Sequence, residues 1–357
     1  MSGAVEERVA AFCAAYDLQI PVLLAPMAGA CPPALSAAVA TAGGMGACGA
    51  LLMGPEEIGE WATQVRSASN GAFQMNLWIP DPAPVRDAAR EAELRAFLGG
   101  WGPEVPEAAG DARGQDFEAQ CAAMLAAGPA VISSIMGVYP ADFVARMKAA
   151  GIRWFATVTT VAEALEAEAA GADVIVAQGM EAGGHRGAFE AEEAARRLVG
   201  LFALLPAVAD AVKVPVVATG GIADARGVAA ALMLGASAVQ IGTGLLRTPE
   251  AGIAPAWAEG LARARPEDTL ATRAFSGRLG RALRTGYAEA AEAGPAPAPY
   301  PVQRGLTAPM RAAAGKEGRL EAMQAWAGQA AALAPAEPAG AVVKRLWDEA
   351  RALLKIA

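Results

Sequence analysis

Eight short apolar segments alternate with alanine-rich, helix-length segments along the first 246 residues of the chain. The apolar segments are residues 21–27, 45–51, 73–79, 130–136, 154–159, 173–178, 214–219 and 238–242. Strands that alternate with helices pair in parallel, because each helix returns the chain to the same end of the sheet. Eight such units are the number that closes a barrel. The sequence therefore predicts an α/β fold of the TIM (β/α)8 barrel class, with an open doubly wound sheet as the alternative.

The alternation stops after Arg247 and divides the chain into three predicted parts. Four prolines between residues 295 and 301 interrupt the next segment, and alanine-rich helical patterns return from about residue 320. We expect a barrel over residues 1–246, a smaller substrate-side domain over 247–320, and C-terminal helices over 321–357 that pack back on the barrel. Within the barrel, one helix is predicted over 192–212, and a partly helical excursion crosses the barrel mouth near 80–115.

Composition narrows the functional classes. Every apolar run is broken before the roughly 18 residues that a membrane span needs, and the first 20 residues lack the pattern of an export signal. The four cysteines show no metal-ligand spacing, so no metal site is expected. A net charge of −8 with interspersed signs argues against nucleic-acid binding. We expect a cytoplasmic protein that acts on small molecules.

The single histidine of the chain, His185, lies in a glycine-rich loop after the sixth predicted strand. The loop begins at Gln178 and includes Gly183 and Gly184. Active sites of such barrels form at the carboxyl ends of the strands, and a histidine there can accept a proton near neutral pH. The alternative is a solvated loop histidine. The glycines around His185 favour the first interpretation, because they let the backbone approach a ligand closely.

Glycine clusters also follow the last two predicted strands. Gly220 and Gly221 end the seventh, and the segment from Gln240 to Thr243 ends the eighth. Backbone N–H groups at such ends commonly bind phosphate, although each cluster alone could be an ordinary turn. Two further strand ends face the same mouth: Asn76 could hydrogen-bond a ring edge, and Met27 could pack against a planar ring.

Taken together, these stretches resemble the bacterial nitronate monooxygenases over nearly the whole chain. The matching segments are PVLLAPMAG, FQMNLW, AQGMEAGGHRG, VVATGGIADARG, AVQIGTGLLRTPE, TRAFSGR, PYPVQRGLTAPM and WAGQ. They fall in order at spacings that suit a barrel. Two departures stand out: Leu245 replaces a more frequent Phe, and Ala225 replaces a common Gly. The first of these could reshape the substrate pocket.

The resemblance implies FMN as a non-covalent cofactor and His185 as the catalytic base. The expected FMN-binding residues are Met27, Asn76, Gln178, Gly183, Gly184, Gly220, Gly221, Gln240, Ile241, Gly242 and Thr243. The implied reaction oxidises alkyl nitronates, such as propionate 3-nitronate, with O2 to a carbonyl compound and nitrite. His185 would deprotonate neutral nitroalkanes, whereas a preformed nitronate would need it less. The oligomeric state is left open.

Three other functions fit parts of the pattern. Flavin-dependent NAD(P)H reductases, of enoyl-acyl carrier protein or of quinone, share a similar histidine loop, but the segments PYPVQRGLTAPM and WAGQ resemble the monooxygenases. A barrel like inosine monophosphate dehydrogenase needs a cysteine nucleophile, and none lies between Gln178 and Gly221. A flavin- or phosphate-binding barrel without catalysis would have no need of His185.

Overall fold

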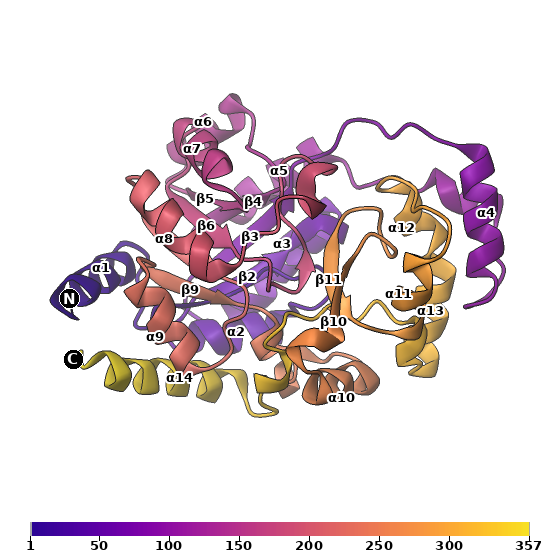
Figure 1. The fold of residues 1–357 in the computed structure, drawn as a ribbon. Coiled ribbons are helices and arrows are strands. Elements are labelled where there is room, and N and C mark those ends of the chain that lie inside the picture. Colours follow the sequence, from indigo (N-terminus) through magenta and orange to yellow (C-terminus); the bar gives the residue numbers. More distant parts are fainter. Residues whose placement is uncertain (1, 357) are drawn as a thin grey trace.

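A closed parallel barrel is the central element of the computed structural model, which describes residues 2–356 (Figure 1). Its eight strands follow the order β1-β9-β8-β6-β5-β4-β3-β2. A parallel bridge between Leu23 and Met45 joins β1 to the residue before β2 and closes the ring. The strands are β1 (Val22–Leu24), β2 (Gly46–Gly49), β3 (Phe73–Trp78), β4 (Val131–Ile135), β5 (Arg153–Val158), β6 (Val174–Gln178), β8 (Val216–Thr219) and β9 (Ala238–Ile241). The predicted (β/α)8 barrel is confirmed, and the open sheet is excluded.

The inward-facing side chains of the barrel change from apolar to polar along the strands. At the amino ends, a cluster that includes Leu23, Phe155 and Val217 fills the interior, and Phe12 of α1 (Ser2–Ala15) packs against it. Further along the same strand faces come buried amides and hydroxyls, because alternate residues of a strand share a face. These are Gln74, Asn76, Ser133, Thr157, Gln178, Thr219 and Gln240. Polar groups therefore collect at the carboxyl ends of the strands.

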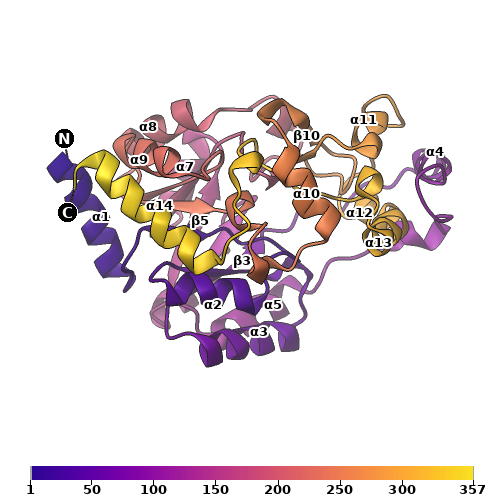
Figure 2. The ribbon, with the colours of Figure 1, turned by 90° about the horizontal axis from the view of Figure 1, so that it is seen from below.

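Helices cover the outside of the barrel (Figures 1 and 2). They are α2 (Pro33–Thr41), α3 (Pro55–Ala68), α5 (Phe117–Ala127), α6 (Ala141–Ala149), α7 (Val161–Ala169), α8 (Leu201–Ala211) and α9 (Ala225–Met233). The C-terminal helix α14 (Ala339–Leu354) packs against α9 and α2. Its buried face carries Val342, Val343 and Leu346, spaced as the apolar stripe of an amphipathic helix.

The single helix predicted over 192–212 is wrong. The structure has a short 3-10 turn at Glu193–Ala195, and α8 begins only at Leu201. Gly200 before it is extended, and the Glu181 carboxylate accepts the Leu201 N–H at 2.9 Å. A carboxylate from the histidine loop thus satisfies a free N–H group at the start of α8, a contact that local propensity does not encode.

A second hydrophobic core lies beside the barrel mouth. Leu94, Leu98 and Val105 pack there with Phe275 and Leu306. We call the region that carries this core, residues 88–111 and 254–326, the capping unit (Figure 1, right). Its elements are α4 (Ala88–Leu98), α10 (Pro255–Arg263), β10 (Thr269–Thr272), β11 (Gly280–Leu283), α11 (Gly286–Glu292), α12 (Val302–Leu306) and α13 (Ala308–Glu317). The excursion expected near 80–115 thus contributes α4 to this unit, and α5, which follows it, covers the barrel wall.

The histidine loop joins the barrel to the capping unit. Its two-residue strand β7 (Gly184–His185) extends the antiparallel pair β10 and β11, with His185 opposite Gly280. His185 is therefore held by backbone pairing from the capping unit. Across residues 2–356, we find no helix with the length and apolar character of a membrane span.

Candidate active site

A cavity of about 260 Å3 lies where the barrel strands end, facing the capping unit. All but one of the residues predicted for cofactor binding or catalysis line it: Met27, Asn76, Gln178, Gly183, Gly184, His185, Gly220, Gly221, Gln240, Gly242 and Thr243. The exception is Ile241. Neighbouring strand residues face opposite ways, so its side chain packs into the outer core with 1% of its surface exposed.

Two strand-end amides present opposite hydrogen-bonding groups to the cavity. The Gln74 amide donates to Gln240 Oε1 at 2.9 Å, which leaves the Gln240 NH2 group as a free donor. Asn76 Nδ2 donates to Ser133 Oγ at 3.0 Å, which leaves Asn76 Oδ1 as a free acceptor. A donor and an acceptor on fixed strand ends can recognise the polar edge of a flat ring.

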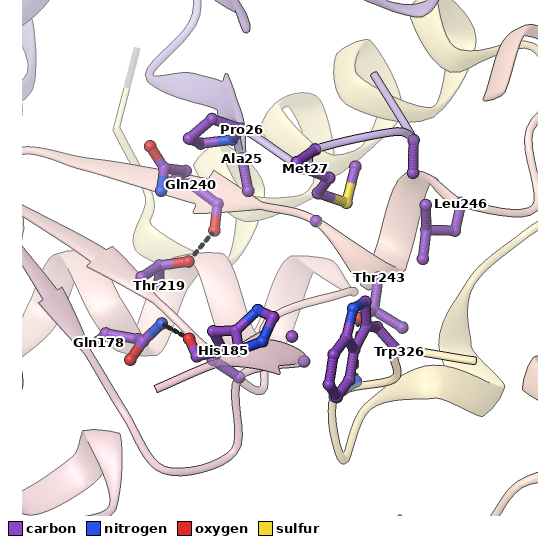
Figure 3. Close-up of a pocket in the computed structure, with 18 of the residues that line it drawn as sticks. Ala25, Pro26, Met27, Gln178, His185, Thr219, Gln240, Thr243, Leu246 and Trp326 are labelled. Carbon is purple, nitrogen blue, oxygen red and sulfur yellow. Dashed lines mark hydrogen bonds between the residues drawn. The ribbon is translucent and has the colours of Figure 1, made fainter. Parts of the chain in front are cut away.

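Gln178 differs from Asn76 and Gln240 because both ends of its side-chain amide are hydrogen-bonded within the protein. Its amide NH2 donates to the His185 carbonyl at 3.0 Å (Figure 3), and its Oε1 accepts the Gly187 N–H at 2.8 Å. Both ends of the side chain are therefore bound within the histidine loop. Gln178 is placed to fix the course of that loop.

The two glycine clusters leave backbone donors free. The N–H groups of Gly220, Gly221, Gly242 and Thr243 donate no hydrogen bond to any of residues 2–356. Gly220 and Gly221 have φ values of +109° and +69°, which other residues rarely adopt. Asp224 accepts the Gly227 N–H at 2.9 Å and caps α9 just behind them. Free N–H groups before a helix N-terminus form an anion site.

Gly183 has a structural reason to be glycine. A Cβ at this position would lie 2.5 Å from the Gly328 nitrogen and 2.8 Å from Thr243 Oγ1. Thr243 Oγ1 also accepts the Gly328 N–H at 3.0 Å. Gly183 therefore lets the histidine loop pack closely against Gly328, in the segment that follows the capping unit. The close approach expected at this glycine is to the protein's own backbone.

His185 is bound through one ring nitrogen and open at the other. Its Nε2 lies 2.7 Å from Ser276 Oγ, and the Ser276 hydroxyl lies 3.2 Å from the Arg278 carbonyl, its only other partner. A carbonyl only accepts, so the hydroxyl donates to it and accepts from His185 Nε2–H. The neutral imidazole then carries its proton on Nε2. Nδ1 has no partner among residues 2–356 and keeps accessible surface.

Aromatic rings enclose His185 on two sides. The Trp78 and Trp326 rings lie edge-on to the imidazole, with centroids 4.6 and 4.7 Å away. Figure 3 shows Trp326 beside His185, with Met27 and Leu246 further across the cavity. These side chains limit the access of water to the histidine.

Burial and positive charge keep the imidazole neutral. Burial, with the charges of Arg278, Arg304 and Arg311, lowers the pKa of His185 to about 3. Arg278 is itself 2% exposed and pairs with Asp81, its Nε donating to the carboxylate at 2.8 Å. At neutral pH the Nδ1 atom is therefore unprotonated, but it is a weak proton acceptor.

Several lining residues were not identified from the sequence. They are Trp78, Arg304, Gln324 and Trp326, with Ser276 behind His185. Most fall within segments that carried the family resemblance, such as TRAFSGR and PYPVQRGLTAPM. No spacing rule brings them to a barrel mouth, so the resemblance was the only signal that could have indicated them.

Comparisons with known sequences agree on one family. The family model described as nitronate monooxygenase matches residues 11–349. A nitronate monooxygenase of Paraburkholderia phytofirmans is 38% identical over 337 residues, covering 92% of each chain. A probable nitronate monooxygenase of Staphylococcus aureus is 31% identical over 343 residues, covering 95% of this chain and 96% of the relative.

Solved structures show the same relationship. The nitroalkane oxidase of Streptomyces ansochromogenes superposes with a TM-score of 0.85 at 36% identity, covering 94% of this chain and 98% of that one. FabK of Thermotoga maritima superposes with a TM-score of 0.75 at 27% identity, covering 97% of both chains. The similarity therefore extends over the barrel and the capping unit together.

Proposed function

The chain belongs to the nitronate monooxygenase family, and from this premise we propose that it uses FMN to oxidise alkyl nitronates with O2, releasing a carbonyl compound and nitrite. The observation that carries the proposal is one cavity that joins free strand-end amides, free backbone N–H groups and a neutral histidine. Propionate 3-nitronate is the substrate with which we would begin.

The residues around the cavity fit FMN. Asn76 Oδ1 and the Gln240 amide offer an acceptor and a donor to the polar edge of the flavin ring. The free N–H groups of Gly220, Gly221 and Thr243 would hold the phosphate, with Met27 available to pack against the ring. When bound, FMN supplies the electron acceptor for the oxidation.

His185 would act on the proton next to the nitro group. Nδ1 is the free nitrogen and would accept this proton from a neutral nitroalkane, while Ser276 holds the proton on Nε2. Because the pKa of His185 is lowered to about 3, this transfer is uphill. A preformed nitronate has already lost the proton. The site therefore favours nitronates over nitroalkanes.

A flavin-dependent NAD(P)H reductase is the second candidate, because such reductases share a glycine-rich histidine loop similar to the one around His185. A reductase would require NAD(P)H as the electron donor, and the oxidation of NAD(P)H would release no nitrite. One pair of assays therefore separates the two candidates.

The test is aerobic turnover by the purified yellow protein, with oxygen uptake and nitrite release measured together. Propionate 3-nitronate and NADH are offered separately, and the flavin is identified after heat release. Nitrite with oxygen uptake, and no oxidation of NADH, is the expected result. Rapid oxidation of NADH without nitrite would assign the protein to the reductases instead, and a colourless protein that takes up no FMN would remove the cofactor proposal.

A further inference from the structure

We propose that Arg304 and Gln324 form a subsite for a carboxylate carried by the substrate, away from its reacting carbon. The inference rests on the proposed function, because it names the part of a nitronate that this wall of the cavity binds. Both residues belong to the capping unit and line the cavity that holds His185. Three features of the wall lead to this assignment.

Arg304 is the only charged side chain among the described residues that line the cavity, and its guanidinium has no partner within residues 2–356. Although the chain carries a net charge of −8, no Asp or Glu lines the cavity. Within residues 2–356 the Arg304 guanidinium makes no ion pair, and it is not among the buried groups that lack a partner. Arg278, whose charge also acts on His185, pairs by contrast with Asp81. A free guanidinium in a cavity without carboxylates attracts an anion.

Arg311 holds both residues of the subsite in place. Its NH2 group donates to the Arg304 carbonyl at 2.8 Å, and its NH1 group donates to Gln324 Oε1 at 3.1 Å. Its Nε atom donates to Thr307 Oγ1 at 3.1 Å. Because Gln324 accepts through its oxygen, its NH2 group remains a free donor. The half-buried Arg311 thus holds the Arg304 backbone and the Gln324 amide on one wall.

The subsite and the expected phosphate site belong to different parts of the fold. The free N–H groups of Gly220 and Gly242 follow β8 and β9 of the barrel, whereas Arg304 lies on α12 of the capping unit. A planar guanidinium suits a carboxylate, which can accept two hydrogen bonds side by side, and the Gln324 amide lines the same cavity as a further donor. A bound carboxylate would also offset the positive charge that Arg304 directs at His185.

The experiment compares two nitronates with the same three-carbon chain. Propionate 3-nitronate carries a terminal carboxylate, and propyl 1-nitronate does not. In Arg304→Gln, KM for propionate 3-nitronate should rise by about tenfold or more, the range expected for hydrogen bonds to a charged group, and KM for propyl 1-nitronate, which has no carboxylate, should rise much less. Arg304→Lys should recover part of the loss, and Arg113→Gln, at an exposed arginine, serves as the control.

A binding measurement makes the result independent of turnover. Isothermal titration of the FMN-loaded protein with butyrate, an unreactive carboxylate, should show binding to the wild type and to Arg113→Gln, but about tenfold weaker binding to Arg304→Gln. Equal KM changes for both nitronates, unchanged butyrate binding, or loss of FMN from Arg304→Gln would each overturn the subsite. If butyrate binds as expected but neither nitronate yields nitrite, the proposed function fails and the carboxylate site stands.

Discussion

The two walls of the cavity are built from different chemistry. The barrel wall offers neutral groups: the amides of Asn76 and Gln240 and the free N–H groups at Gly220 and Gly221. The capping wall carries the charge, with Arg304 in the lining and Arg278 and Arg311 behind it. Under the proposed function, the barrel wall would hold the cofactor, and the capping wall would set the electrostatics around the substrate.

The two walls also differ in the interactions that hold their side chains in position. The barrel groups end strands that are locked by the parallel ladder, so their positions follow from the fold. The capping groups depend on the second hydrophobic core, on the pairing of Gly280 with His185, and on the bond between Arg278 and Asp81. His185 belongs to both walls, because its loop follows barrel strand β6 and pairs with β11 of the capping unit.

The largest effect should come from His185→Asn. We expect kcat/KM for neutral nitroalkanes to fall by roughly 10² to 10⁴, the usual contribution of a positioned base. Turnover of preformed nitronates and the flavin absorbance should change little, and both serve as internal controls. Since the pKa of His185 is lowered to about 3, the wild-type rate on nitroalkanes should show no transition near pH 6.5, and should fall only as acid protonates Nδ1 near pH 3. An equal loss on both substrates, or a transition near 6.5, would contradict this account.

Gly220→Ala should weaken FMN binding by the barrel wall and leave the capping wall unchanged. Its φ of +109° strains any other residue, and a Cβ would lie 3.1 Å from the Ala182 nitrogen and the Gly179 oxygen. Strain of about 1–3 kcal/mol at such a position should weaken FMN binding by roughly tenfold or more, measured by flavin fluorescence on titration. Gly227→Ala is the matched control, because Gly227 lies within α9 and its added Cβ makes only ordinary contacts, at 3.5 Å or more. If the two variants bind FMN equally well, the Gly220 loop is not the phosphate site.

Ser276→Ala changes a residue of the capping unit, and it should have the smallest effect of the three substitutions. Loss of the acceptor at Nε2 leaves the imidazolium with one partner fewer, so nitroalkane turnover should fall by about tenfold. The FMN affinity and the turnover of preformed nitronates should stay the same. Ser276→Thr keeps the hydroxyl and should recover most of the rate. A uniform loss on both substrates, or no recovery with threonine, would mean that Ser276 supports the fold and does not position the imidazole.

Much of the barrel could be predicted from the sequence, because its signals are local. The strand and helix periods gave eight units, and the glycine clusters marked the strand ends that now surround one cavity. The two errors have different causes. The helix predicted over 192–212 is divided because a carboxylate from a distant loop, Glu181, starts α8 at Leu201. Ile241 was included with its neighbours, although strand alternation turns its side chain into the core.

The sequence by itself therefore determined the barrel, the carboxyl-end location of the site, and the histidine on which the proposed chemistry depends. Only the tertiary structure decided what surrounds that histidine: the Ser276 contact at Nε2, the two tryptophan rings, and the charge of Arg304. The physical reason is the separation along the chain of the residues that determine each feature. A hydrophobic period or a strand end is written in consecutive residues, whereas the pKa of a buried group depends on charges that the fold brings from about 90 to 125 residues away along the chain.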